Sequence, residues 1–291
     1  MSVTLGEGTT PLIAAPRVSA RLGVEVWLKL EGANPTGSFK DRGMAVAVSR
    51  ALERGAPGVV CASTGNTAAS AAAYAARAGI EAAIVIPSGA VAGGKLAQAR
   101  AVGARIVEID GGFSAAYEAS LELASSEGYT VVNSTNDDRI EGQKRAAFEV
   151  LEQLGDLPDA LLLPYGGGGN TKAYARGFQE ARGRLPRLHP AQAERRDDTF
   201  ASAIRIVEPV HRAEVDEAVE RSGGSVVTLG EQELRAAWLR LARDEGVFCE
   251  PASAAGIAAL EHGVAKPGER VVCVLTGHGL KDPDAVARAA A

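Results

Sequence analysis

Short β-branched runs alternate with alanine-rich stretches along the first half of the chain, and this alternation limits the fold more than any other feature. Four of the runs are typical of buried strands, at 58–62, 82–86, 105–109 and 129–132. Helical segments, each ending close to a glycine, are expected between them at 66–78, 93–102 and 113–126. Strand–helix–strand repeats of this length predict βαβ units and a parallel sheet with right-handed crossovers.

The second half continues the pattern. Helices are expected at 140–154, with Gly155 as its stop, and at 230–243, and buried strands at 161–163 and 271–275. The stretch 183–199 is rich in Arg, Pro and Asp and gives no strand signal. These elements predict two α/β layers that share a cleft.

Charge and composition exclude several classes of protein. The 291 residues include 36 acidic and 31 basic side chains, a net charge of -5, whereas a general nucleic-acid binder needs a basic face. The apolar runs are far shorter than the roughly 20 residues that span a bilayer, and the N-terminus has no signal-peptide pattern. Cys61, Cys249 and Cys273 have no metal-ligand spacing. We expect a globular cytoplasmic protein with no metal, membrane or nucleic-acid partner.

Two polar segments lie at the starts of expected helices and contain residues that could act as a reactive amine or bind an anion. Lys40 lies in segment 34–43 (NPTGSFKDRG), a turn-forming loop before an apolar helix. The positive potential of a helix N-terminus, with partial burial, would lower the pKa of its amine, as a Schiff-base lysine requires; a solvated lysine is the alternative. Segment 63–70 (STGNTAAS) follows a strand, so it could bind a carboxylate or phosphate, or simply cap the helix through Ser63 or Asn66.

Two further segments follow strands in the second half. The run Gly166–Gly169, followed by Asn170, lets the backbone approach a phosphate closely, although it matches neither the dinucleotide fingerprint nor a Walker A loop. Segment 275–283 (LTGHGLKDP) follows the last strand, at the edge where open α/β sheets bind ligands. Thr276 could offer a neutral hydroxyl to a ring nitrogen; a polar turn with a half-exposed His278 is the alternative.

Taken together, these segments resemble the tryptophan-synthase-β-like (fold type II) pyridoxal-phosphate enzymes, and among them the threonine synthases. The lysine segment carries the resemblance, with support from 5–12 (LGEGTTPL), 28–36 (LKLEGANPT), 139–144 (RIEGQK) and 248–256 (FCEPASAAG). It runs from about residue 4 to residue 284, with fewer residues near 188–198 than the family has for its strand there. It implies two open, mostly parallel twisted sheets flanked by helices, with the active site in the cleft between a large cofactor-binding domain (1–42 and 137–291) and a small domain (43–136).

The resemblance also implies roles for the site residues. Lys40 would be the catalytic residue, which binds pyridoxal 5'-phosphate covalently and later carries protons. The cofactor would be held by Lys40, Asn66, Gly166, Gly167, Gly168, Gly169, Asn170 and Thr276. The substrate carboxylate would be bound by Ser63, Thr64 and Thr67. The substrate's own phosphate would be bound by Asn133, Ser134 and Arg139.

The implied reaction converts O-phospho-L-homoserine and water to L-threonine and phosphate by β,γ-elimination and replacement, in a homodimer. Arginine suits paired recognition of phosphate, although a surface salt bridge with Asp137 or Glu141 is the alternative for Arg139. The all-glycine loop is more typical of serine/threonine dehydratases, which need no second phosphate site. A pyridoxal-phosphate-dependent dehydratase is therefore the alternative function, and a non-catalytic phosphate- or nucleotide-binding α/β module is a further one.

Overall fold

The computed structural model describes residues 2–89 and 93–290, which divide into two compact units. The first unit comprises the chain up to Glu7 together with Asn34–Gln143, and the second comprises Gly8–Ala33 and the chain from Lys144 onward. The division expected from the sequence, 1–42 with 137–291 against 43–136, assigns the chain up to Glu7 and residues 34–42 and 137–143 differently. As a division into functional domains it stays a prediction.

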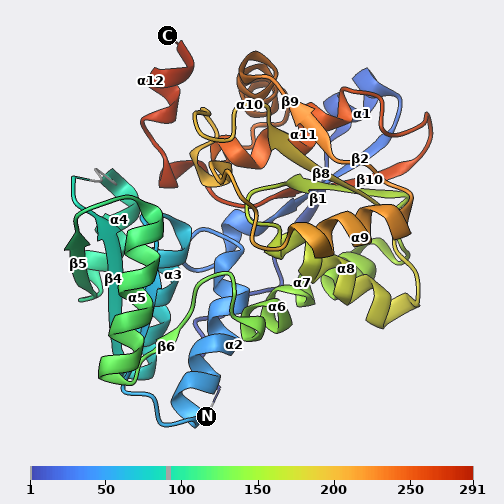
Figure 1. The fold of residues 1–291 in the computed structure, drawn as a ribbon. Coiled ribbons are helices and arrows are strands. Elements are labelled where there is room, and N and C mark those ends of the chain that lie inside the picture. The colour runs from blue at the N-terminus through green and yellow to red at the C-terminus, as the bar shows by residue number, and fades with distance from the viewer. Residues whose placement is uncertain (1, 90–92, 291) are drawn as a thin grey trace. The chain divides into compact units, whose positions relative to one another are not determined.

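The first unit is a parallel four-stranded sheet with helices on both faces (Figure 1). The strand order is β5-β4-β3-β6, with bounds Arg105–Ile109, Glu81–Pro87, Gly58–Ala62 and Thr130–Val131. The helices are α2 (Lys40–Glu53), α3 (Asn66–Ala78), α4 (Gly93–Ala101), α5 (Phe113–Glu127) and α6 (Asp137–Gln143). Because successive strand residues face opposite sides, Val59 and Cys61 pack with α2, α3 and α4, whereas Val60 and Ala62 pack with α5.

The second unit is built on a six-stranded sheet in the order β1-β2-β10-β7-β8-β9. Only the β1–β2 pair is antiparallel among these pairings. The strands are β1 (Leu12–Ala14), β2 (Glu25–Leu30), β7 (Ala160–Pro164), β8 (Arg187–Ala193), β9 (Val227–Leu229) and β10 (Arg270–Leu275). The helices are α1 (Pro16–Leu22), α7 (Arg145–Leu154), α8 (Gly169–Arg182), α9 (Arg212–Ser222), α10 (Glu231–Glu245), α11 (Ala255–Leu260) and α12 (Ala285–Ala290). Short 3-10 helices occur at Glu31–Ala33, Ser202–Ile204, Pro251–Ala254 and Gly279–Lys281.

Both faces of this larger sheet are also covered. Leu28 and Cys273 pack with α1, α10 and α11, whereas Leu161 and Val272 pack with α7, α8 and α9. Strands that are buried on both faces carry no polar alternation, which explains the continuous apolar runs in the sequence. The expected α/β fold with two open, mostly parallel sheets flanked by helices is confirmed.

The helix expected at 140–154 is two helices, α6 and α7, separated at Lys144. The first packs against α2 and the second against α8, so each helix is oriented by the helix that it contacts. A Cβ on Gly177 of α8 would lie 2.5 Å from the carbonyl oxygen of Lys144, which shows how closely that crossing is packed. The second helix ends at Gly155 in the left-handed conformation, as the sequence predicts.

The expectation of no strand in 183–199 is wrong, because β8 pairs with both β7 and β9. Pro190 conceals this strand in the sequence, since proline has no N–H for a ladder. The carbonyl of Ala191 accepts a hydrogen bond from Tyr165 on the β7 side, so the neighbouring Pro190 nitrogen faces β9. Pairing with β9 begins only at Ala191, and Pro190 therefore occupies a position that the ladder leaves open.

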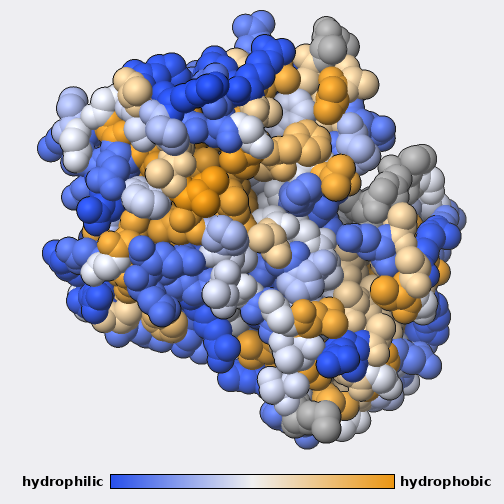
Figure 2. Space-filling model, turned by 180° about the vertical axis from the view of Figure 1, so that it is seen from behind, coloured by the Kyte–Doolittle hydropathy of each residue, from blue (hydrophilic) through white to orange (hydrophobic). Residues whose placement is uncertain are grey.

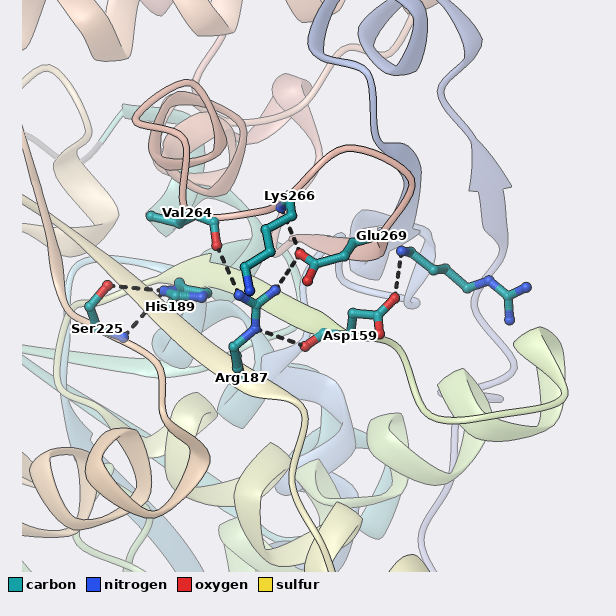
Figure 3. Close-up of polar contacts among 8 residues, drawn as sticks. Asp159, Arg187, His189, Ser225, Val264, Lys266 and Glu269 are labelled. Atoms are coloured by element: carbon teal, nitrogen blue, oxygen red, sulfur yellow. Dashed lines mark hydrogen bonds and ion pairs between the residues drawn. The ribbon is translucent and has the colours of Figure 1, made fainter.

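A polar cluster joins the segments that precede β7 and β10 to the first residue of β8 (Figure 3). Arg187 donates to the carbonyl oxygens of Asp159 (3.5 Å) and Val264 (3.4 Å) and forms an ion pair with Glu269. The Asp159 carboxylate accepts the backbone N–H of Arg270 at 2.8 Å. These contacts fix the amino ends of three adjacent parallel strands.

His189 lies two residues further along β8 and is 4% exposed. Its Nδ1 accepts the backbone N–H of Ser225 at 3.2 Å, so the proton of the neutral ring is on Nε2. Burial, together with the charge of Arg187, lowers the pKa of this ring below its ordinary value. Burial therefore favours the neutral form of His189.

The described surface is mixed in character. Figure 2 shows hydrophilic side chains around smaller hydrophobic areas on the face turned away from the viewer in Figure 1. The exposed large hydrophobic residues in the described part of the chain belong to both units: Leu5, Val102, Phe113, Leu121, Val207, Val210, Leu280 and Val286. Within residues 2–89 and 93–290, no helix combines the length and apolar character needed to cross a membrane.

Candidate active site

Lys40 is the first residue of α2, at the position that the sequence predicts. The side chain is half-buried, and its Nζ lies 4.4 Å from the centre of the Phe39 ring. The next residue, Asp41, is fully buried, and its carboxylate accepts three hydrogen bonds of 2.6 Å, from the N–H and hydroxyl of Thr36 and the hydroxyl of Ser70. These bonds fix the loop that presents Lys40. Sequence reasoning missed Asp41, although it lies within the lysine segment.

Ser63, Thr64 and Thr67 lie where β3 ends and α3 begins, and all three are half-buried. The Ser63 hydroxyl accepts the N–H of Gly65 at 3.1 Å, and α3 starts after Gly65 with no side-chain cap. The alternative in which Ser63 or Asn66 caps the helix is therefore wrong. A helix start without a side-chain cap offers its first N–H groups to an anion such as a carboxylate.

Asn133 is buried just after β6 and is bonded to the end of β3. Its Oδ1 accepts the N–H of Ala62 and its Nδ2 donates to the carbonyl of Ala62, both at 3.0 Å. The amide thus holds the backbone beside Ser63 and keeps one Nδ2 proton for another acceptor. Its assignment to the substrate phosphate stays a prediction, as does that of Ser134.

Arg139 is 1% exposed, on α6. Its Nη1 donates to the carbonyl of Val132 at 3.2 Å, its Nε has no partner, and no described carboxylate pairs with it. The surface salt bridge with Asp137 or Glu141 is therefore wrong. Burial lowers the pKa of Arg139 to about 10, so the guanidinium stays charged at neutral pH. An oxyanion such as phosphate would satisfy it through paired hydrogen bonds.

Two glycines bring α6 into backbone contact with the first turn of α2. A Cβ on Gly142 would lie 1.9 Å from the carbonyl oxygen of Arg42, and one on Gly43 would lie 2.7 Å from the carbonyl oxygen of Arg139. Side chains at either position would separate the helices. This close crossing therefore fixes Arg139 relative to the helix that begins with Lys40.

In the second unit, the glycine run leads from β7 into α8. Gly168 has φ +88°, and a Cβ there would lie 2.8 Å from Cγ2 of Val215, so this position requires glycine. The carbonyl of Gly167 accepts the N–H of His211 at 3.0 Å. In the described residues, the N–H groups of Gly167, Gly168 and Gly169 donate to no backbone acceptor.

These loop donors fit the phosphate of pyridoxal 5'-phosphate. Uncapped N–H groups at the start of a helix form an anion-binding concavity. Asn170, the second residue of α8, is buried, and its Nδ2 has no hydrogen-bond partner among the described residues. The side chain and the loop together provide donors but no negative charge, which suits a phosphate dianion.

Thr276 follows β10 and is 5% exposed. Its Oγ1 lies 3.0 Å from the hydroxyl of Ser253, which also accepts the N–H of Gly277 at 3.0 Å. The pair presents neutral hydroxyl groups, as a ring nitrogen without a proton requires. Ser253 was missed as a site residue, although it lies in the segment 248–256. His278 is exposed, and its Nδ1 accepts the N–H of Leu280 at 3.1 Å, as in a polar turn.

The predicted site residues occupy equivalent places in the two sheets. In the first unit they follow the carboxyl ends of β3 and β6, and Lys40 begins α2. In the second unit they follow the carboxyl ends of β7 and β10. Open parallel sheets bind ligands at these strand ends.

Comparison with known proteins agrees with this geometry. The family model described as "Pyridoxal-phosphate dependent enzyme" matches residues 3–277. The threonine synthase of Bacillus sp. (strain ULM1) is 49% identical over 301 residues, which cover 97% of this chain and 86% of that protein. The threonine synthase of Mycobacterium leprae is 49% identical over 303 residues, with 97% and 84% covered. The structure of threonine deaminase isoform 2 from Solanum lycopersicum aligns with TM-score 0.84 and 25% identity, covering 96% of this chain and 86% of that one. This chain belongs to the family of pyridoxal-phosphate-dependent enzymes, among the threonine synthases.

Proposed function

We propose that this protein is a lyase that converts O-phospho-L-homoserine and water to L-threonine and phosphate with pyridoxal 5'-phosphate. The observation that carries the choice of substrate is the buried guanidinium of Arg139, which has no carboxylate partner in the described residues. With its α-carboxylate bound at the start of α3, a β-hydroxy amino acid has no second anionic group to satisfy this charge, whereas O-phosphohomoserine has its γ-phosphate. The names of the relatives support the same reaction.

Different cofactor-binding residues bind different parts of the cofactor. Pyridoxal phosphate supplies an electron sink for the electron pairs that remain when substrate C–H bonds break. The amine of Lys40 holds it covalently, while the loop N–H groups and Asn170 bind its phosphate. The hydroxyl of Thr276 would offer a neutral partner to the ring nitrogen, and the amide of Asn66 would donate to the phenolic oxygen.

The substrate-binding residues orient the two ends of the substrate. Ser63, Thr64 and Thr67, at the start of α3, bind the α-carboxylate. Arg139 binds the γ-phosphate and directs it as the leaving group. The amine of Lys40, when not bonded to the cofactor, would remove the α-proton and later move protons at the neighbouring carbons.

The test is to measure phosphate and threonine together when the cofactor-loaded protein meets O-phospho-L-homoserine. We expect equal amounts of both. A second candidate is a serine/threonine dehydratase, which the glycine at position 167 favours because no side-chain amide is present there to meet a substrate phosphate. Release of ammonia and a 2-oxo acid from L-threonine, with no phosphate from O-phosphohomoserine, would establish the dehydratase instead.

The assembly and the cellular location belong to the same proposal. We infer a homodimer, as the resemblance to the family implies, and a cytoplasmic location. The described cysteines Cys61, Cys249 and Cys273 are buried free thiols, which agrees with a reducing compartment. Size-exclusion chromatography with light scattering tests the assembly, because a measured mass of one chain would contradict the homodimer.

A further inference from the structure

Arg196 follows β8 and connects this strand to the entrance of the glycine loop. Its Nη1 donates to the carbonyl of Ile206 at 2.9 Å and makes a longer contact of 3.4 Å with the carbonyl of Gly166. Its Nη2 donates to Oε1 of Gln192, and its guanidinium carbon lies 4.6 Å from the centre of the Tyr165 ring. Arg196 therefore contacts both residues that lead from β7 into the loop.

The charge of Arg196 is partly withdrawn from water. The side chain is half-buried, and burial lowers the pKa of the guanidinium from its ordinary value. Its guanidinium donates to neutral oxygens, and no carboxylate in residues 2–89 and 93–290 neutralises it. Its field therefore acts on the loop with less screening than that of an exposed arginine.

The contacts behind the loop determine where the loop N–H groups point. The carbonyl of Gly166 faces Arg196, and the carbonyl of Gly167 accepts the N–H of His211. In a trans peptide, the C=O of one residue and the N–H of the next point in opposite directions. The N–H groups of Gly167 and Gly168 therefore point away from Arg196 and His211.

We propose that Arg196 is a positioning residue for the cofactor phosphate. It holds the Gly166–Gly167 peptide so that the N–H of Gly167 donates to the phosphate, and its charge behind the loop stabilises the dianion. The backbone of His211 does the same for the next peptide without a charge. Arg196 itself does not touch the phosphate. The inference depends on the cofactor and is independent of which amino acid is the substrate.

The experiment compares Arg196→Met with Arg195→Met. Arg195 is the adjacent residue; its side chain is 64% exposed and pairs with Asp198 at 3.3 Å, so it controls for loss of one positive charge in the same segment. Pyridoxal phosphate is titrated into each cofactor-free protein, and the phosphorus NMR signal of the bound cofactor is recorded. We expect the dissociation constant of Arg196→Met to rise about tenfold or more, with a displaced phosphorus signal, and Arg195→Met to match the wild type.

Pyridoxal, which has no phosphate, separates positioning from a general structural role. If Arg196 acts through the phosphate, the affinity for pyridoxal should be the same in Arg196→Met and the wild type. Equal losses for pyridoxal and pyridoxal phosphate, or an unchanged phosphorus signal, would overturn the proposal. If Arg196→Met does not fold, Arg196→Gln, which keeps N–H donors without the charge, decides the question with the same two ligands.

Discussion

Replacing Arg139 by methionine should stabilise the phosphate-free protein while it removes turnover of the phosphorylated substrate. Burial lowers the pKa of this guanidinium to about 10, so the folded state holds the proton less tightly than the unfolded chain. Below that pH the guanidinium is charged in both states, and its burial reduces the free energy of unfolding by the full amount. The drop in pKa corresponds to about 3 kcal/mol. Methionine fills the site without a charge, and the lost hydrogen bond to Val132 costs about 1 kcal/mol. The free energy of unfolding should rise by about 2 kcal/mol.

The assay is urea unfolding of the cofactor-free protein in phosphate-free buffer, with kcat/KM measured on the loaded enzyme. Arg77→Met is the matched control, because Arg77 also donates to a carbonyl oxygen at 3.2 Å, that of Thr4, but is exposed. Its free energy of unfolding should change by no more than about 0.5 kcal/mol. For Arg139→Met, kcat/KM on O-phosphohomoserine should fall at least about a hundredfold. Added inorganic phosphate should stabilise Arg139→Met less than it stabilises the wild type and Arg77→Met, because the vacant cofactor loop also offers donors to phosphate in all three proteins.

Two results would refute this reasoning separately. If Arg139→Met is less stable than Arg77→Met in the absence of phosphate, the buried charge is not the cost that the structure indicates. If Arg139→Met keeps its kcat/KM, the guanidinium does not bind the substrate phosphate. The first result leaves the proposed reaction intact, and the second does not.

Four other substitutions test the site and the fold. Lys40→Ala should abolish turnover and change the free energy of unfolding by no more than about 0.5 kcal/mol, because the half-buried amine adds little stability; residual turnover in the purified variant would contradict the assignment. Asp41→Asn should lower the free energy of unfolding by about 2 kcal/mol, since its buried carboxylate accepts three hydrogen bonds; urea unfolding gives the value, and an unchanged midpoint would argue against the role. Gly142→Ala should raise KM for O-phosphohomoserine and leave cofactor affinity unchanged, because its Cβ would push against the Arg42 carbonyl; equal effects on both would count against it. His189 has a folded-state pKa below its ordinary value, so the free energy of unfolding should fall as the pH drops below about 6.5. His189→Gln should reduce that fall, measured by urea unfolding at pH 7.5 and 5.5. Equal losses in the wild type and His189→Gln would assign the effect to other groups.

Local sequence patterns predict the architecture because the sheets are covered on both faces. Runs such as 58–62 and 105–109 become strands with those bounds, since each needs apolar residues on both sides. The same rule fails for β8, where Pro190 and the polar residues around it remove the apolar signal. The strand forms because β7 and β9 flank it, which is long-range information.

Local patterns also place the site residues at strand ends but not their partners. The segment around Arg139 contains Asp137 and Glu141, so the sequence offers a surface ion pair, and only the packing of α6 against α2 buries the guanidinium. The amide of Asn133 bonds to Ala62, on a strand far away in the sequence. The partner of Asp41 on α3, Ser70, is likewise set by helix packing. Such contacts depend on tertiary structure, which local spacing does not encode.

The strand order of the larger sheet has a consequence for biosynthesis. The early strand β2 has the last strand of the chain, β10, as its parallel neighbour, with Glu25 beside Arg270. At synthesis rates of about 5–20 residues per second, β2 leaves the ribosome on the order of tens of seconds before this neighbour exists. The four strands of the smaller sheet emerge within that interval and can pair at once. The edge of β2 that pairs with β10 therefore stays unpaired in the nascent chain until β10 is made. A chain that terminates before β10 lacks the strand that joins β2 to β7, so its larger sheet cannot form.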